Sequence, residues 1–322
     1  EPFPLMGSRA SIAFEGNMAQ VQNNQLRYIG EGAGVNGVLI EESATNLLPS
    51  APGLALETPY TSGTLNGTYT LKVYAGSGTV TLSGGASGTV TPGNHITFTV
   101  SNATVTFTPS GGTPAYLMLV MKAYPLSWMP GGTTRQADQL YIPVEEVKKF
   151  INLNEGCIEV LHTPTLATKQ SPGYLFLMQE LYNKNRLDIS TNNGSFQHIS
   201  ANNDNVLGDA YATNKTIIEN VLTSLDINYT KNILSHLING NLNGMGVSNS
   251  PKLPEKHNSM MLGFQCSGFL HHVIFSEPRT VEDRVNRQRF AQANGYYQID
   301  DKVQAFIPLE SGLVGYRRTG SL

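Results

Sequence analysis

Charge is what this sequence has least of. Charged residues make up 14% of the 322-residue chain, against about 25% in a typical soluble domain. The net charge is −3, from 21 basic and 24 acidic residues. Proteins that bind nucleic acid usually carry a clustered basic surface, so we expect no nucleic-acid partner. Since Asn, Thr, Ser and Gly take the place of charged residues, we expect a neutral, hydrated surface.

Cysteines and long apolar runs are scarce as well. Cys157 and Cys266 are the only two cysteines, too few for a disulfide framework or for a zinc site with about four ligands. We expect two buried, reduced thiols; one disulfide between them is the alternative. No apolar run approaches the roughly 18 residues of a membrane span, so no membrane partner is expected. Residues 1–4 lack the pattern of a signal peptide.

Alternation of apolar residues with threonine is abundant in the first half of the chain. It occurs at residues 68–74, 78–83, 96–100 and 103–108. A period of two places the apolar residues on one face of a strand and threonine on the other. Gly-Gly, Pro-Gly and Ser-Gly pairs separate these runs about every eight to twelve residues, a spacing typical of a β-sandwich. We therefore predict a jelly-roll domain over residues 45–125.

Residues 143–322 predict a second β-sandwich with a short helix near its end. Apolar runs that are typical of buried strands occupy residues 157–161, 174–178 and 269–275. Thr280 and Asp283 have the spacing of a capping box, which predicts a helix that begins after Thr280. Gly295 is a suitable residue to end that helix.

Two further segments complete the predicted organisation. Residues 126–142 are interpreted as a connector, in which Trp128 packs between the domains. Residues 1–44 are interpreted as an extended N-terminal assembly segment, whose short strands add to the sheet edge of a neighbouring subunit. Such an exchange would make the chain a homo-oligomer, most naturally a trimer or a ring. The predicted fold class is all-β: two β-sandwich (jelly-roll) domains in tandem, an extended N-terminal segment and a short C-terminal helix.

Glu155 and Glu159 are the best candidates for a catalytic pair. A glycan hydrolase needs two carboxylates on either side of the scissile bond, about 5–5.5 Å apart for retention or about 6.5–9.5 Å for inversion. Residues four apart on a strand share a face, but we favour a solvated strand face over catalysis. The adjacent pairs 41–42 and 145–146 are expected to point to opposite faces of strands, solvated or paired. We assign no catalytic residue and predict that the protein is not an enzyme.

Metal and cofactor sites are also left unassigned. His271 and His272 are neighbours on a predicted strand and face opposite ways, so they are poorly placed to chelate a metal; we expect one of them to be hydrogen-bonded in the core. Residues 202–205, with Asp209, carry the oxygen ligands that calcium prefers. A calcium site there is the alternative to a polar surface loop, and no other cofactor is expected.

Tyrosine rings are the candidate sugar contacts, because a flat ring face packs against a pyranose ring. Packing in the core or at its rim is the ordinary interpretation of such residues. The candidates are Tyr69, Tyr74, Tyr182, Tyr211 and Tyr229. None of them is assigned to a glycan site.

Three stretches, taken in order, resemble a layout of tailed-bacteriophage virion and tail proteins. GVLIEESATNLL at residues 37–48 resembles the junction into a carbohydrate-binding-module-like jelly roll. SWMPGGTTRQAD at residues 127–138 resembles its exit, where family members carry Ser-Tyr-Ile-Pro and then Thr-Arg-x-Ala-Asp. LING at 237–240 and GFLHHVIF at 268–275 resemble the closing part of a laminin-G-like or concanavalin-like lectin sandwich. The Trp-Met pair at residues 128–129 departs from the family pattern.

This resemblance implies a structural component of a phage particle with a lectin-like surface. The component would be a tail fibre, a tail-associated protein or a capsid-decorating protein, exposed on the virion and assembled in the host cytoplasm. Its partners would be copies of itself, other virion proteins and a host cell-surface glycan. Two alternatives remain open, a host-glycan receptor-binding protein and a polysaccharide depolymerase.

Overall fold

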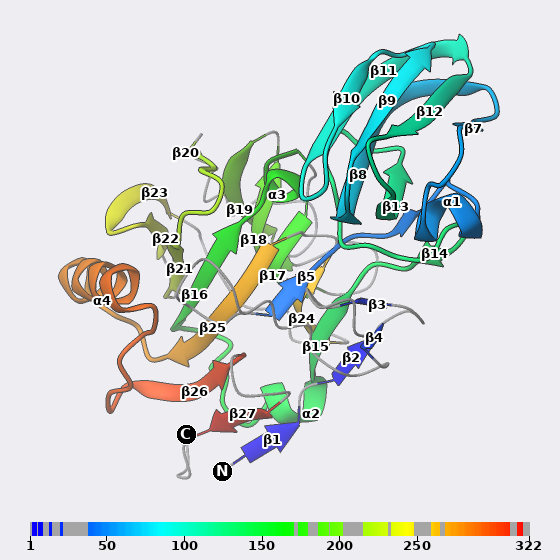
Figure 1. Cartoon of the computed structure of the whole chain (residues 1–322). Helices are drawn as coiled ribbons and strands as arrows, with labels where there is room; N and C mark the ends of the chain where they lie inside the picture. Colours follow the sequence, from blue (N-terminus) through cyan, green and yellow to red (C-terminus); the bar gives the residue numbers. More distant parts are fainter. Residues whose placement is uncertain are drawn as a thin grey trace. The chain divides into compact units, whose positions relative to one another are not determined.

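The structure is a computed structural model that describes most of the chain. It covers residues 2–4, 6–8, 13–14, 20–21, 38–170, 173–179, 186–192, 194–201, 215–230, 233–247, 259–264, 268–309 and 314–317. The chain divides into a small unit, residues 10–22 and 43–137, and a large unit, residues 1–9, 23–42 and 138–322. All described strand pairs are antiparallel (Figure 1), and the predicted all-β class is confirmed.

The small unit contains two main sheets. One has the order β10 (Gly88–Val90), β9 (Thr79–Gly84), β12 (Val105–Ser110) and β7 (Tyr60–Thr61); the other has the order β11 (His95–Ala103), β8 (Leu65–Gly76) and β13 (Pro114–Val120). Shorter elements are β3 (Ala13–Phe14), β4 (Gln20–Val21), β6 (Ala44–Thr45), β14 (Thr134–Arg135) and the helix α1 (Ser50–Leu54). Apolar residues of both sheets, such as Leu71 and Phe107, form one core.

The alternation with threonine has the predicted consequence in the small unit. On β8, Leu71 and Val73 are fully buried, whereas the hydroxyl of Thr68 lies 3.1 Å from that of Thr99 on β11 at the surface. The same arrangement joins Thr61 of β7 to Thr106 of β12, at 2.9 Å. The strands β7, β8, β11 and β12 therefore have one face toward the core and one face that carries threonine hydroxyls.

Trp128 lies inside the small unit. Its ring is 6% exposed, and its Nε1 donates to the carbonyl oxygens of Gly53 (3.3 Å) and Leu117 (3.2 Å). Tyr116 meets the indole edge-on, with ring centroids 5.0 Å apart. These partners all belong to the small unit, so the expected position of Trp128 between two domains is replaced by a position in one interior.

The large unit is a sandwich of two larger sheets. The nine-stranded sheet contains, in order, β1 (Pro2–Pro4), β27 (Val314–Arg317), β26 (Val303–Pro308), β25 (Gly268–Ser276), β16 (Gly156–Pro164), β21 (Thr223–Tyr229), β22 (Ile233–Ile238) and β23 (Asn241–Val247), with β5 (Val38–Ile40) also paired to β25. The seven-stranded sheet contains β2 (Met6–Ser8), β15 (Gln139–Pro143), β24 (Ser259–Phe264), β17 (Gly173–Gln179), β18 (Arg186–Asn192), β19 (Ser195–Ala201) and β20 (Lys215–Thr216). Val160 and Ile227 of the first sheet and Phe176 and Leu262 of the second meet in one core.

Strands from the first 44 residues pair within their own chain. β1 pairs with β27, β2 with β15 and β5 with β25. Each of these strands bonds to backbone N–H and C=O groups of its partner strand that would otherwise be unpaired. β1 and β2 lie at the ends of their sheets, and the addition of N-terminal strands to a neighbouring subunit's sheet stays a prediction.

The helix α4 (Val281–Asn294) lies against the outer face of the nine-stranded sheet, over β21 and β22. It begins as predicted: the Thr280 side chain accepts from the backbone N–H of Asp283, at 3.2 Å. It also ends as predicted, at Gly295 in the left-handed region with φ 83°. Two short helices, α2 (Val144–Val147) and α3 (Leu166–Gln170), complete the described elements.

Candidate functional site

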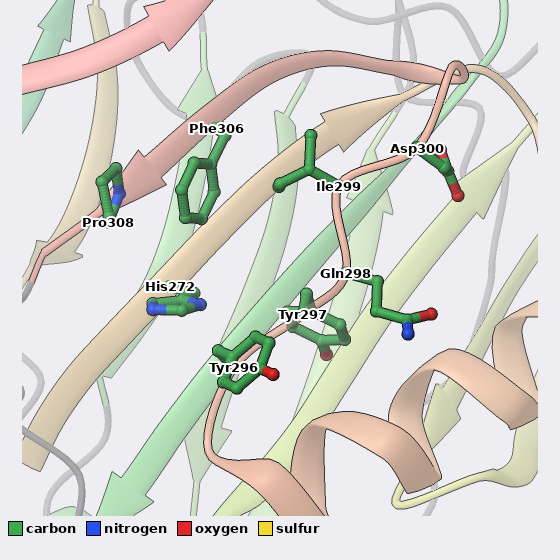
Figure 2. Close-up of a pocket in the computed structure, with 8 residues that line it drawn as sticks. All are labelled: His272, Tyr296, Tyr297, Gln298, Ile299, Asp300, Phe306 and Pro308. Carbon is green, nitrogen blue, oxygen red and sulfur yellow. The ribbon is translucent and has the colours of Figure 1, made fainter.

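An open pocket of ≈ 630 Å³ lies on the outer face of the nine-stranded sheet, just beyond the end of α4 (Figure 2). β25 contributes His272, and β26 contributes Phe306 and Pro308. The segment that follows α4 contributes the remaining lining residues, Tyr296, Tyr297, Gln298, Ile299 and Asp300. All of them belong to the large unit.

The segment after α4 is fixed at both of its ends. Gly295 takes the left-handed conformation that ends many helices, which redirects the chain toward the sheet. Tyr297 then inserts its side chain into the interior, where its hydroxyl donates to the carbonyl oxygen of Val160 at 3.4 Å. Burial raises the pKa of Tyr297 well above its ordinary value, so the hydroxyl remains a donor.

Asp300 anchors the other end through two arginines. Arg279 donates to both carboxylate oxygens of Asp300, at 2.9 and 2.7 Å, and Arg287 Nη1 donates to Oδ2 at 2.8 Å. Partial burial alone would raise the pKa of Asp300, but the hydrogen bonds and positive charges of Arg279 and Arg287 outweigh it and hold that pKa below its ordinary value. Asp300 is therefore ionised near neutral pH and is a hydrogen-bond acceptor.

The same arginines reach a buried acid of the sheet. Glu159 on β16 is fully buried, and Arg287 donates to its Oε1 and Oε2 at 2.8 Å each through Nε and Nη2. Burial raises the pKa of Glu159 even though Arg287 and Arg279 lower it. The prediction of a solvated strand face is wrong for Glu159, which lies in the interior beneath α4. Glu155 is exposed, as predicted.

A second buried ion pair lies beside the first. Arg284 of α4 donates through Nε to Oδ2 of Asp226 on β21, at 3.1 Å, and its Nη2 is also paired with that carboxylate. Asp226 accepts further bonds from the backbone N–H of Leu237 and from Gln288 Nε2, each at 3.0 Å. Two acids of the sheet thus face three arginines, which we call the ionic cluster: Glu159, Asp226, Arg279, Arg284 and Arg287.

Aromatic side chains give the pocket its apolar surface. Tyr296 is 47% exposed and rests edge-on against Phe290, with centroids 5.5 Å apart. Phe306 meets His272 edge-on at 5.2 Å. Figure 2 shows Tyr296, His272, Phe306 and Ile299 around the hollow, with Gln298 and Asp300 on the opposite side of the segment. The result is an apolar hollow, bordered by a segment that also carries polar side chains.

The histidines and tyrosines named from the sequence are mostly interior groups. His271 Nε2 lies 2.8 Å from the Thr163 hydroxyl, and both residues are buried. Tyr69 is buried and bonds to the backbone of Asn66. The Tyr229 hydroxyl donates to the carbonyl oxygen of Asn152 at 2.9 Å. His271, Tyr69 and Tyr229 do not line the pocket, whereas the buried His272 does.

Other predicted residues lie elsewhere or outside the description. The Tyr74 hydroxyl donates to the carbonyl oxygen of Leu126 in the small unit. Cys157 is a buried free thiol whose pKa is raised by burial. Outside the described residues are Tyr182, Tyr211, Cys266, Asp209 and residues 202–205.

The remaining acidic pairs agree with expectation only in part. Residues 145–146 are paired as expected, with Lys148 and Lys149 three residues on, but they lie in the first turn of α2 and not in a strand. Glu41 and Glu42 follow β5 and are buried. Among the described residues, no group of three or more His, Cys, Asp or Glu side chains is placed to hold a metal ion. In the same part of the chain, no helix has the length and hydropathy needed to cross a membrane.

Sequence reasoning missed both the ionic cluster and the pocket. The signal for the cluster was present: acids interrupt apolar runs at Glu159 and Asp226, and Arg284, Arg287 and Gln288 share one face of the predicted helix. The pocket left no comparable signal, since its residues come from two strands and an irregular segment.

Comparisons with known proteins give similarities of fold only. No protein-family model and no curated sequence matches the chain. Among solved structures, the CBM40 of the Ruminococcus gnavus IT-sialidase bound to α2,3-sialyllactose is 12% identical, with a TM-score of 0.35 over 42% of this chain and 82% of that one. Domain 4 of an extracellular arabinanase from Geobacillus stearothermophilus, in complex with arabinotriose, is 13% identical, with a TM-score of 0.38 over 51% and 82%. A heptameric SAP-like pentraxin from Limulus polyphemus is 15% identical, with a TM-score of 0.36 over 53% and 86%. At TM-scores below 0.5, these similarities carry no information about a ligand site in this chain.

Proposed function

We propose that the large unit binds carbohydrate at this pocket. The observation that carries the proposal is an exposed tyrosine, Tyr296, in an open hollow that Phe306, Ile299 and Gln298 also line. A sugar ring has an apolar C–H face and a circle of hydroxyls, so it needs a flat apolar surface and a few hydrogen-bonding groups. Ligand sites in general combine mostly apolar linings with a small number of placed polar groups.

One polar side chain of the segment after α4 is suited to bind sugar hydroxyls. It is not Asp300, because Arg279, Arg287 and the backbone N–H of Lys302 already donate two hydrogen bonds to each of its carboxylate oxygens. The amide of Gln298 is exposed and can both donate and accept. Tyr296 supplies a rigid ring at a low cost in conformational entropy.

The charge of the lining favours a neutral glycan. No lysine or arginine is among the residues that line the pocket. Arg279 and Arg287, which lie next to it, are already engaged by Asp300 and Glu159. An acidic sugar would therefore place its carboxylate near Asp300 without a cation to pair with.

We also propose binding without hydrolysis. A glycosidase needs two carboxyl groups on either side of the bond, one of them protonated, and Asp300 is the one carboxylate among the pocket's lining residues. Its lowered pKa makes it a poor proton donor. Incubation with capsular polysaccharide should leave the viscosity unchanged; a fall in viscosity would revive the depolymerase alternative.

A glycan microarray tests the binding proposal directly, followed by titration calorimetry of the strongest hit. Replacing Tyr296 by Ala should weaken binding about tenfold, since the loss of one stacked ring and its buried area is worth about 1.4 kcal/mol. Tyr296→Phe should stay close to the original affinity because it retains the ring. Ile218→Ala is the control, as Ile218 is 61% exposed and does not line the pocket. No signal on the array, or equal binding by Tyr296→Ala, would refute the proposal.

For the biological setting we propose the surface of a phage particle, supported by the sequence resemblance at residues 37–48 and 127–138. Light scattering coupled to size exclusion on the full chain would test it. A discrete oligomer supports a particle component. A monomer at micromolar concentration would favour a detached glycan-binding module.

A further inference from the structure

On the basis of the carbohydrate function proposed above, we propose that Tyr316 on β27 is a second stacking position. The ligand would then be a neutral oligosaccharide that lies across β26 and β27, with one sugar at the pocket and a later sugar on Tyr316. Tyr316 does not line the pocket, so this position extends the site.

The strand register places Tyr316 on the pocket's side of the sheet. Phe306 of β26 is the direct partner of Tyr316 in the antiparallel ladder, and directly opposed residues project to the same face. On β26, Ala305 and Ile307 are buried in the sandwich core. Phe306, which alternates with them, faces outward and lines the pocket.

The row continues beyond Tyr316. Pro2 of β1 is the direct partner of Tyr316 on its other side, and Pro2 is exposed. Figure 1 shows β26, β27 and β1 side by side in this order. With about 4.8 Å between neighbouring strands, the row extends the apolar surface about 10 Å past Phe306.

The exposure and chemistry of the row fit a sugar chain. Tyr316 is 46% exposed, nearly the same fraction as Tyr296. A single exposed ring is ordinary, but a contiguous apolar row that adjoins a pocket marks an interaction surface. Phe306, Tyr316 and Pro2 carry no charge, and the Tyr316 hydroxyl adds a polar group at the ring's end. Phe306, Tyr316 and Pro2 together span three strands, about 10 Å, which is more than one sugar ring covers and points to an oligosaccharide.

The test compares chain lengths on one microarray that carries neutral glycans in series of one to six sugars. For the original protein, binding should strengthen about tenfold between the monosaccharide and the longer members of the responding series. Tyr316→Thr should remove that gain and leave monosaccharide binding within about twofold. Threonine is chosen because it removes the ring and retains a high preference for strands. Tyr316→Phe, which retains the ring, should behave like the original protein.

The outcomes separate this inference from the function on which it rests. If Tyr316→Thr binds long chains as well as the original protein does, or if chain length has no effect, the second position is refuted. Binding that still depends on Tyr296 would in that case leave the pocket proposal intact. If no glycan on the array binds, both are refuted. Thermal unfolding of each variant controls for loss of β27.

Discussion

Replacing Arg284 by Met should remove much of the large unit's stability. The Arg284 and Asp226 side chains are 1% and 0% exposed, and they are paired through two of the guanidinium nitrogens. Met fills much of the same volume with an apolar chain but donates nothing. The variant therefore leaves the carboxyl group of Asp226 buried between α4 and the sheet without its cation.

The expected loss is about 3 kcal/mol. Removing one partner of a buried ion pair generally costs about 3–5 kcal/mol, because the other charge stays buried and unpaired. Here the lower end applies, since Asp226 retains hydrogen bonds from the Leu237 N–H and from Gln288. A loss of this size is a large part of the roughly 5–15 kcal/mol that stabilises a typical domain.

The loss should also depend on pH, with a defined sign. Burial raises the pKa of Asp226 even with Arg284 present, and removing the guanidinium raises it further. The folded variant then holds a proton that the unfolded chain releases, so its stability falls as pH rises through the raised pKa. The difference between Arg284→Met and the original protein should thus be smaller at pH 5 than at pH 8.

Urea denaturation followed by circular dichroism at both pH values measures this difference. In the Arg284→Met background, Asp226→Asn removes the buried charge and should recover about half of the loss at pH 8. Lys148→Met is the control, because Lys148 forms an exposed pair with Glu145 and should change stability by about 0.5 kcal/mol or less. A loss below about 1 kcal/mol at pH 8, or one that grows toward low pH, would refute the reasoning.

Three further predictions concern local features. Thr280→Ala should lower the stability by about 1 kcal/mol, seen as a lower thermal midpoint, since it removes the N-cap acceptor of the Asp283 N–H. Gly295→Ala should cost about 1 kcal/mol because φ is 83° there, and calorimetry should also show weaker glycan binding, since the following residues form the pocket wall. Trp128 is the only tryptophan and is buried, so tryptophan fluorescence should report unfolding of the small unit. The emission of Trp128 should shift to longer wavelength in urea. Emission already at long wavelength in the native protein would contradict this prediction.

Local sequence patterns were sufficient to predict elements whose structure depends on residues close together in the sequence. The threonine alternation at residues 68–74 predicts β8 because a period of two follows from strand geometry alone. The start and end of α4 were predicted for a similar reason, since Thr280 and Gly295 act on backbone groups within one turn.

The environment of Glu159 could not be predicted in this way. Alternation on β16 places Glu159 on the face opposite Ile158, but it does not say whether water or another element covers that face. The answer depends on Arg287, which is 128 positions away in the chain. The sequence therefore favoured a solvated face, whereas the structure places several of the few charged residues inside.

The ionic cluster explains why a pocket can form on an irregular segment. Residues 296–300 have no strand or helix ladder to hold them, and a loop of this kind would ordinarily lose conformational freedom when a ligand binds. Here Asp300 is bonded to Arg279 and Arg287, which are themselves fixed by Glu159 beneath α4. The wall that carries Tyr296 is thus ordered by the folding of the interior before any ligand arrives. The charges that stabilise the contact between α4 and the sheet therefore also lower the entropic cost of glycan binding. Weakening the ionic cluster should reduce the affinity for the glycan even when every residue that touches the glycan is unchanged.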